Sequence, residues 1–428
     1  MKSSWKLRLI TLKTGRSLGR VAAKIIRNIV PFALRQRVLC LIGGPARAEI
    51  KISEFKFNPT SRWDIICFPV IDWSFLFQRP QHLVEQFAGD GHRVFYLHKS
   101  FHQSSYSSAF IRALSDNIYG LRFPGPAGTR VVYQSEIDGP LLQHFLETLD
   151  DLRHHAGIKK AICLVDLPFW APLAFAARGQ WGWKIVYDCM DDHRGFTTNS
   201  PVMTQHEEGL ILGSDLVVAT SQALYDRVSP SARRALLLHN ATDFDHFSRS
   251  GSCSPLSGLP HPIIGYFGTV SEWFNLRMVE AAAVARPHWQ FVFIGDAYGV
   301  DLSSLKHLSN VHFVGILPYH TLPACLQQFD VACIPYLLTP LTQAMNPVKF
   351  YEYLSMGKPV VAVDLPELKP YSEYFYLVRS TQDFITQIEA ALVEQSVAKV
   401  QARVTFARQN TWSHRYEVLK DALEIDDR

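Results

Sequence analysis

Residues 346–363 read Asn346-Pro-Val-Lys-Phe-Tyr-Glu-Tyr-Leu-Ser-Met-Gly-Lys-Pro-Val-Val-Ala-Val363. Asn346 is a good N-cap, Pro347 suits the first helical turn, and Gly357 suits the position just after a helix. A proline follows that blocks further helix, and residues 360–363 are apolar like a buried strand. The stretch therefore predicts a three-turn helix that leads directly into a strand of a parallel sheet.

Lys349 breaks a local rule, because a cation is disfavoured in the first turn of a helix. Free backbone N–H groups, the helix dipole and an ammonium together form a strong anion site. Glu352 lies three residues later and projects from the same face of the helix. A cation for phosphate and a carboxylate for sugar hydroxyls suit a nucleotide-sugar. The alternative is a solvated Lys/Glu pair on a surface helix.

The bulk composition describes an ordinary globular chain of two or three domains. The chain has 428 residues, 47% apolar and 19% charged, and its net charge of +4 is too small to imply nucleic acid. The seven cysteines form no C-x-x-C pair and no cluster with histidine, which suits structural thiols in a reducing cytosol. The sequence has neither an apolar run long enough for a membrane span nor a secretory signal peptide.

Residues 1–48 differ in composition from the rest of the chain. They contain eleven Lys and Arg residues and no acid before Glu49. The basic residues recur at helical spacing, with apolar residues on the opposite side, so this segment predicts a basic amphipathic helix that contacts an anionic membrane surface. A helix packed on the protein itself, or a disordered arm, is the alternative.

A β-loop-α-β pattern begins at residue 63 and predicts the start of a doubly wound sheet. Residues 63–69 form the first expected strand, and the loop 70–81 leads to a helix that ends near Gly89. The loop carries Arg79 at the carboxyl end of the strand, where ligands of such sheets bind. Arg79 is therefore a candidate for the site, although it could instead bind local carbonyl groups.

A cluster of acids follows the expected strand 184–187. It reads Asp188-Cys-Met-Asp-Asp-His193. Two adjacent carboxylates can raise one another's pKa, which suits a general base. At least one of Asp191 and Asp192 is therefore expected to be functional; the alternative is that both cap the next helix.

The strand–helix alternation stops at a Ser/Gly/Pro-rich stretch and then restarts, which predicts two similar α/β domains. The expected divisions are a basic N-terminal segment, a first sheet domain, a linker, a second sheet domain and a C-terminal amphipathic helix, at residues 1–60, 61–247, 248–260, 261–408 and 409–428.

Several motifs together resemble one family. They are Phe77-Gln-Arg-Pro-Gln-His82, Tyr187-Asp-Cys-Met-Asp-Asp192, Tyr266-Phe-Gly-Thr-Val-Ser-Glu-Trp273, His239-Asn-Ala-Thr-Asp243 and Met345-Asn-Pro-Val-Lys-Phe-Tyr-Glu-Tyr353. In order and spacing they resemble bacterial glycosyltransferase family 4, closest to its polysaccharide and teichuronic acid biosynthesis enzymes. The resemblance covers about residues 62–425. It implies the GT-B fold, in which two Rossmann-like domains with parallel sheets face each other across the active site.

The resemblance implies that the second domain binds a UDP-, GDP- or dTDP-sugar as co-substrate, without a metal or a tightly bound cofactor. Glu352 would bind the ribose, and Lys349 with the helix N-terminus would bind the diphosphate. Arg79 and Asp191 or Asp192 would face the acceptor, a saccharide or lipid-linked saccharide at the inner face of the membrane. The implied donor contacts are Gly268, Thr269, Gly315, Ile316, Asn346, Pro347, Val348, Lys349 and Glu352.

The sequence departs from the family pattern at two places. The family often carries Glu-x7-Glu, and Ala344 stands where its first acid would be. The family's Arg and Lys after the first strand of the second domain are also missing from residues 269–276. Lys349 and Arg79 would then carry more of the leaving-group charge.

The resemblance implies a transferase that retains anomeric configuration. Three alternatives to such a transferase are open. A nucleotide-sugar epimerase of the same fold would act without an acceptor. A degenerate transferase that scaffolds polysaccharide assembly is suggested by Ala344, whereas Lys349 and Glu352 argue against it. A nicotinamide oxidoreductase is disfavoured, because G-x-G-x-x-G follows neither first strand.

Overall fold

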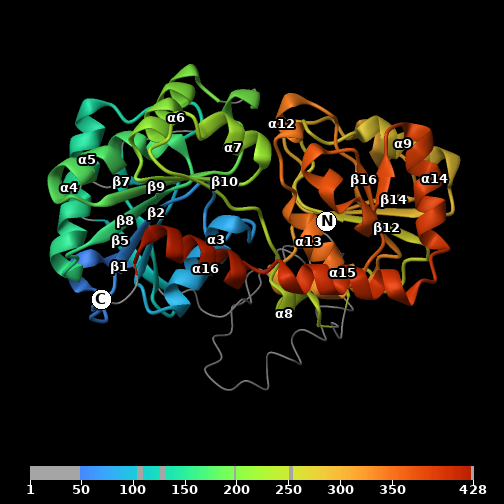
Figure 1. Cartoon of the computed structure of the whole chain (residues 1–428), viewed down its shortest axis with the longest axis horizontal. Coiled ribbons are helices and arrows are strands. Elements are labelled where there is room, and N and C mark those ends of the chain that lie inside the picture. Colours follow the sequence, from blue (N-terminus) through green and yellow to red (C-terminus); the bar gives the residue numbers. More distant parts are fainter. Residues whose placement is uncertain (1–48, 104–108, 126–131, 197–198, 250–253, 426–428) are drawn as a thin grey trace, which may run out of the picture. The chain divides into compact units, whose positions relative to one another are not determined.

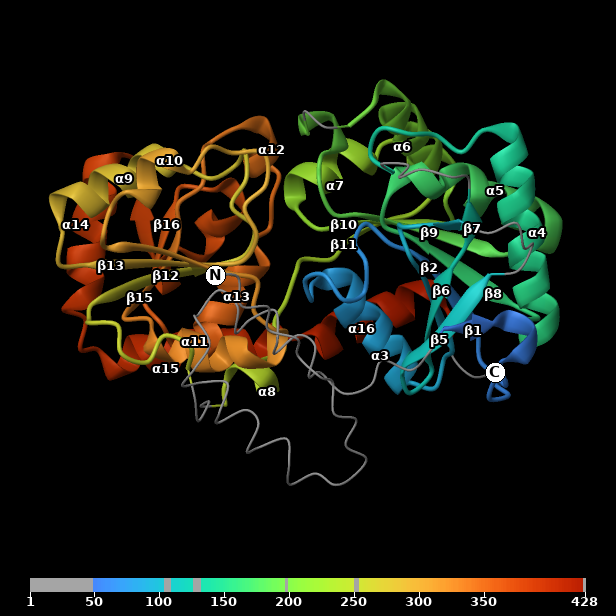
Figure 2. The same cartoon turned by 180° about the vertical axis from the view of Figure 1, so that it is seen from behind.

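The computed structural model describes residues 49–103, 109–125, 132–196, 199–249 and 254–425. In this part of the chain two large sheets are covered by helices (Figure 1, Figure 2). The basic helix expected within residues 1–48 lies outside the described residues and stays a prediction.

The first sheet has nine strands in the described residues, ordered β1-β5-β6-β3-β2-β8-β9-β10-β11. Neighbours are parallel from β6 to β11, whereas β5 is antiparallel to both of its neighbours, β1 and β6. The predicted parallel sheet is thus confirmed, with an antiparallel edge that the sequence reading missed. In sheet order the strands are Ile50–Lys51, Phe110–Ser115, Ile118–Arg122, Val94–Leu97, Asp64–Phe68, Ala161–Val165, Lys184–Cys189, Leu216–Ala219 and Ala235–Leu237.

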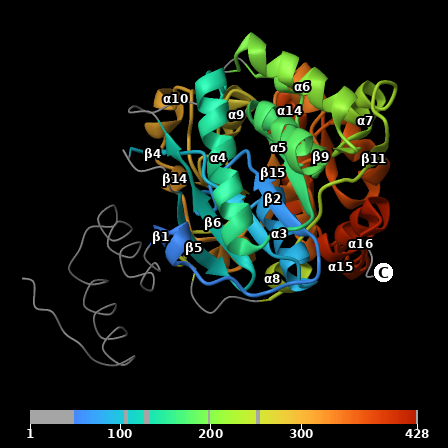
Figure 3. The ribbon, with the colours of Figure 1, turned by 90° about the vertical axis from the view of Figure 1, so that its left-hand side faces the viewer.

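Both faces of this sheet are buried. Successive strand residues point to opposite sides, and each of the two sets belongs to a hydrophobic core. Ile66 and Phe68 of β2 belong to a core with α4, α5, α6 and α7, while Ile65 and Cys67 face a core with α3 and α16. Figure 3 shows α4 and α5 in front of the strands. The helices are α3 (Arg79–Gly89), α4 (Gly139–Ala156), α5 (Ala171–Trp181), α6 (Pro201–Gly213), α7 (Gln222–Val228) and α16 (Trp412–Leu423).

The second sheet has six parallel strands in the described residues, ordered β14-β13-β12-β15-β16-β17. These strands are Val311–Gly315, Gln290–Ile294, Ile263–Phe267, Val331–Ile334, Val360–Val363 and Tyr376–Val378. One core cluster joins them to their helices. The helices that follow β12 are α9 (Leu276–Ala285), α10 (Ser303–Lys306), α11 (Leu322–Gln328), α12 (Pro340–Gln343), α13 (Val348–Ser355), α14 (Thr381–Leu392) and α15 (Val397–Gln409).

Smaller elements complete the described chain. A two-stranded sheet pairs β4 (His102–Gln103) with β7 (Pro124–Gly125), and α8 (Phe244–Phe247) follows the last strand of the first sheet. No helix among the described residues is both long and apolar enough to cross a membrane.

The stretch 346–363 folds nearly as predicted, with one correction at its start. Strand β16 matches the prediction, and Gly357 adopts φ +67° after α13. The amides of Gly357 and Lys358 donate to the carbonyls of Leu354 and Tyr353, which closes the helix end. However, α13 begins at Val348 with Pro347 in the capping position, so it has about two turns and not three.

Two other local predictions were incomplete. Helix α3 begins at Arg79, inside the expected loop, because the Gln78 amide donates to Gln81 Oε1 (3.1 Å) in a capping box. No helix was predicted at residues 139–156, where the structure has α4. Asp138 caps its first turn by accepting from the Leu141 amide, and Gly157 ends it in the left-handed conformation.

Candidate active site

The amino end of α13 presents Lys349 beside the end of β12. The Lys349 ammonium lies 5.5 Å from the centre of the Tyr266 ring, and the side chain is half-buried. Pro347, the N-cap residue, forms no side-chain hydrogen bond with the first turn of the helix. No described residue forms a hydrogen bond or ion pair with the Lys349 ammonium. A cation at a helix N-terminus without a counter-ion is the arrangement that favours an anionic ligand.

Gly268 makes room for this lysine. It has φ +135°, and a Cβ at this position would lie 2.0 Å from Lys349 Cε and 2.6 Å from Nζ. Gly295, at the end of β13, is similarly restricted, since its Cβ would lie 2.2 Å from the Gly268 carbonyl oxygen. The missing side chain of Gly268 therefore leaves room for the lysine at the carboxyl end of β12. The missing side chain of Gly295 leaves room for the Gly268 backbone.

Glu352 lies one turn deeper on the same helix and is only 5% exposed. Burial raises the pKa of Glu352 to about 8, Lys349 opposes this rise, and Asp243 adds to it. The electrostatic interaction with Lys349 agrees with the predicted shared face. At neutral pH most of the Glu352 population is therefore protonated and able to donate as well as accept a hydrogen bond.

The remaining predicted donor contacts lie around the same strand ends, but several of their polar groups are used by the protein. The Thr269 carbonyl accepts from the Tyr266 hydroxyl (2.9 Å), and the Gly315 carbonyl accepts from the Gly295 amide (2.9 Å). Gly315 has φ +80°, and the next residue, Ile316, is 41% exposed. The roles of Thr269, Gly315 and Ile316 in binding the donor stay predictions.

Asn346 is not the helix cap that the sequence suggested, because both of its acceptors bind Asn240. Its Oδ1 accepts from the Asn240 amide (2.9 Å), and its carbonyl accepts from Asn240 Nδ2 (2.6 Å). Val348 packs against the core of the first sheet, and so does Ala344, which is 8% exposed. The position where the family often has an acid is thus filled by a small apolar residue in a core.

Arg79 is 2% exposed, and its guanidinium is bound by the protein on all sides. Its Nε and Nη2 donate to the two oxygens of Asp188 (2.7 and 2.9 Å), and Nη1 donates to the Leu238 carbonyl (3.0 Å) and Asn240 Oδ1 (3.3 Å). This geometry favours the alternative left open by the sequence, in which Arg79 binds carbonyl groups. Its role with the leaving group stays a prediction.

The structure distinguishes the two neighbouring acids after β9. Asp192 caps a short 3-10 helix, His193–Gly195, and accepts two hydrogen bonds from Arg194 (both 2.9 Å). Burial opposes its ionisation, but Arg194 holds the pKa of Asp192 below its usual value. Asp192 therefore takes the capping role that the sequence left open.

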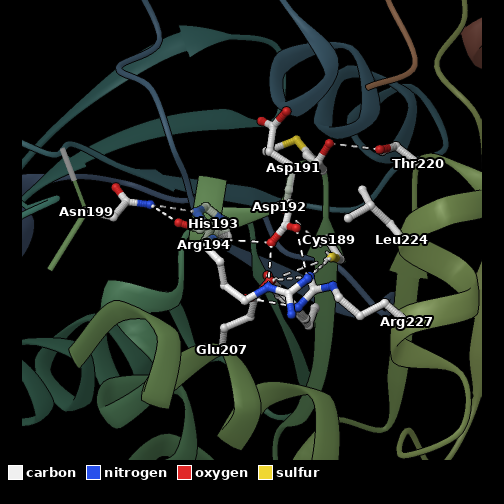
Figure 4. A network of polar contacts seen from close by, with 12 residues as sticks. Cys189, Asp191, Asp192, His193, Arg194, Asn199, Glu207, Thr220, Leu224 and Arg227 are labelled. Carbon is white, nitrogen blue, oxygen red and sulfur yellow. Dashed lines mark hydrogen bonds and ion pairs between the residues drawn. The ribbon is translucent and has the colours of Figure 1, made fainter. Parts of the chain in front are cut away.

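Asp191 is half-buried, and no described residue forms a hydrogen bond or ion pair with its carboxylate. Its side chain points away from the neighbouring polar network that contains Glu207 and Arg227 (Figure 4). Burial and the charges of Asp188 and Asp192 raise the pKa of Asp191 to about 6, while Lys349 opposes the rise. The structure thus brings Asp191 within electrostatic range of Lys349, although the two residues come from different sheets. An acid that titrates near neutral pH is suited to act as a general base.

A network that the sequence reading missed supports this loop (Figure 4). Glu207 on α6 is 1% exposed and accepts from Arg227 on α7 (2.7 Å) and from the Tyr187 hydroxyl (2.9 Å). Arg227 also donates to Cys189 Sγ (3.4 Å). The only sequence signal for these residues is a charge on each of two largely apolar helix faces, which does not identify the partner.

No group of three or more His, Cys, Asp or Glu side chains within the described ranges is arranged to hold a metal ion. The five cysteines in these ranges, at positions 67, 163, 189, 325 and 333, are buried free thiols.

Comparison with known sequences gives one family and one curated relative. Residues 261–394 match the family model "Glycosyl transferases group 1". A relative from Bacillus subtilis (strain 168), described as putative teichuronic acid biosynthesis glycosyltransferase TuaH, is 26% identical over 254 residues. That match covers 54% of this chain and 64% of the relative, which is less than two thirds of its length.

Several solved structures have a fold similar to that of this chain. Sucrose-phosphate synthase from Thermosynechococcus elongatus has a TM-score of 0.68 at 15% identity, over 85% of this chain and 98% of that one. Anabaena HepE in complex with UDP and glucose has a TM-score of 0.59 at 17% identity, over 85% and 99%. A trehalose-6-phosphate synthase structure, from a study of glycosyl transfer with retention, has a TM-score of 0.61 at 13% identity, over 86% and 100%. At such identities these likenesses show the GT-B fold alone.

Proposed function

Since the chain has the GT-B fold and its residues 261–394 match the group 1 glycosyl transferases, we propose that the protein transfers a sugar from a nucleotide-sugar to a saccharide or lipid-linked saccharide. The observation that carries the proposal is Lys349, a cation at the amino end of α13 with which no described residue forms a hydrogen bond or ion pair. A cell-surface polysaccharide is the proposed product, which the similarity to a teichuronic acid transferase supports. Assignment to glycosyltransferase family 4 in particular stays a prediction.

The proposed donor is a UDP-, GDP- or dTDP-sugar held by the second sheet. Its diphosphate would bind Lys349 beside Gly268, and its ribose would bind Glu352. The complex of HepE with UDP and glucose supports a nucleotide-sugar as co-substrate for this fold. The chemical task is to stabilise the departing nucleoside diphosphate, which a preorganised cation and N–H groups perform electrostatically.

We further propose a reaction without a metal and with retention of anomeric configuration. Lys349 would hold the leaving diphosphate, and Asp191 would accept the proton of the attacking hydroxyl. The bond from the acceptor oxygen to the anomeric carbon forms as the bond to the diphosphate breaks. Retention requires that the acceptor oxygen attacks from the side on which the diphosphate leaves. Glycosyl transfer with retention is the subject of the study of a trehalose-6-phosphate synthase whose structure is similar to this chain.

Replacing Glu352 with alanine should weaken nucleotide binding. Loss of a hydrogen bond between neutral groups, here the protonated Glu352 and a ribose hydroxyl, costs about 0.5–1.5 kcal/mol, which corresponds to roughly 2–13-fold in Kd. Titration calorimetry with UDP, GDP and dTDP measures the effect. Glu367→Ala is the matched control, because Glu367 is equally buried at 6% exposure but accepts from the Gln222 amide. Unchanged affinity in Glu352→Ala would assign Glu352 to structure.

The proposed location is the inner face of the cell membrane, with residues 1–48 as the attachment. The eleven basic residues in this segment support the proposal, since each is worth about 1 kcal/mol near an anionic surface. Deleting residues 1–48 should move the protein from the membrane fraction to the soluble fraction of a cell lysate. A truncated protein that still sediments with membranes would contradict this role.

The transferase proposal is tested by incubating the protein with UDP-, GDP- and dTDP-sugars and a membrane lipid extract, followed by assignment of the anomer in any product. A new glycosidic bond in one combination supports it. Interconversion of the sugar without an acceptor would indicate an epimerase. Binding without turnover would indicate a scaffold, and Ala344 is the observation that favours that second candidate.

A further inference from the structure

A chain of buried polar contacts runs from the end of β9 to the start of α13. Asp188 binds Arg79 through two hydrogen bonds, Arg79 donates to Asn240, and Asn240 makes two hydrogen bonds to Asn346. All four residues are at most 8% exposed. Arg79 and Asn346 lie far apart in the sequence, and Asn240 forms hydrogen bonds with both of them.

The direction of each hydrogen bond in this chain is determined by chemistry. A guanidinium can only donate, so the Asn240 group that it contacts is the amide oxygen. The Asn240 nitrogen must then be the atom that donates to the Asn346 carbonyl, because a carbonyl can only accept. The Asn240 side chain therefore satisfies both neighbours in a single orientation, and no residue of another type reproduces both contacts with the same shape.

The two ends of the chain of contacts lie next to the two groups of the proposed reaction. Asp188 is three residues before Asp191, and Asn346 is three residues before Lys349. We infer that four positioning residues hold Lys349 at a fixed position relative to Asp191. They are Asp188, Arg79, Asn240 and Asn346, and we name them the hinge relay. This inference rests on the proposed function for its effect on turnover, but not for its effect on local structure.

A second contact in the same region provides a matched control. The Thr242 hydroxyl lies 3.0 Å from the Ser355 hydroxyl, and both residues are at most 2% exposed. This contact joins the same segment to the same helix, but at its carboxyl end, away from Lys349. Ser355→Ala removes a buried polar contact without changing the hinge relay.

The decisive variant is Asn240→Ala, with Asn240→Asp as the second. The aspartate keeps the acceptor for Arg79 and removes the donor to the Asn346 carbonyl. Misplacement of reacting groups by about 1 Å can cost roughly 100-fold in rate. We therefore expect both variants to lower turnover by about 10–100-fold and, because Lys349 also binds the diphosphate in the proposed function, to weaken UDP binding in a titration. Ser355→Ala should keep its turnover.

Hydrogen–deuterium exchange of the unliganded full chain tests the relay by a measurement that does not depend on enzymatic activity. Asn240→Ala should speed exchange both at residues 348–350 and at residues 188–193, whereas Ser355→Ala should speed exchange only in the second half of α13. Faster exchange confined to the segment around residue 240, or equal losses of turnover in Asn240→Ala and Ser355→Ala, would overturn the relay. If the exchange pattern holds and no sugar is transferred by the unchanged protein, the proposed function fails and the relay stands.

Discussion

Replacing Lys349 with alanine should lower the turnover of sugar transfer by roughly 10²–10³-fold and leave the fold intact. The ammonium is half-buried beside Gly268 and Tyr266, and no described residue forms an ion pair with it. It is therefore available to stabilise charge that develops on a departing diphosphate. Initial rates at saturating donor, together with a thermal unfolding curve, measure both parts of the expectation.

Lys358→Ala is the matched control for this variant. Lys358 lies just beyond the other end of α13, where its ammonium donates to the carbonyls of Gln327 (2.8 Å) and Phe329 (2.6 Å). Its loss should reduce stability and spare the chemical step. A loss below about tenfold in Lys349→Ala, against the range typical of such donors, would remove Lys349 from the proposed mechanism.

Replacing Asp191 with asparagine should lower kcat/KM by roughly 10²–10⁴-fold, the usual contribution of a general base. The pH dependence gives an independent test. A base must be ionised to accept a proton, and the pKa of Asp191 is raised to about 6, mainly by burial. The kcat/KM of the unchanged protein should therefore rise with pH through about 6, and Asp191→Asn should lose this limb of the profile.

Asp192→Asn serves as the comparison. Asp192 is ionised well below pH 6 because Arg194 stabilises its charge, so its removal should loosen the loop without moving the limb of the profile. If Asp192→Asn abolishes the limb and Asp191→Asn retains it, the assignment of the two acids must be reversed. If neither changes the profile, proton transfer does not depend on this loop.

The local predictions that succeeded depend on interactions between near neighbours in the sequence. The strand 360–363 and the left-handed Gly357 follow from composition and backbone freedom, which act within a few residues. The anion site at Lys349 was predicted in the same local way, because a lysine in a first helical turn conflicts with the dipole, and it stays a prediction. The missed helix α4 had local signals too, since Asp138 and Gly157 are ordinary capping residues.

The tertiary structure alone distinguished residues of the same type. Arg79 is bound by Asp188, which is 109 positions away, so its guanidinium is occupied by a partner that no local pattern reveals. Asn346 has good capping chemistry but binds Asn240, 106 positions earlier, and the helix begins two residues later. Asp191 and Asp192 are identical in sequence terms, and only the position of Arg194 relative to each leaves one paired and the other available. The sequence therefore determined the helices and strands and the set of candidate charged residues. The tertiary structure decided which of these charges are paired within the protein and which can bind a ligand, because a buried ion pair forms only where the fold brings its two residues together.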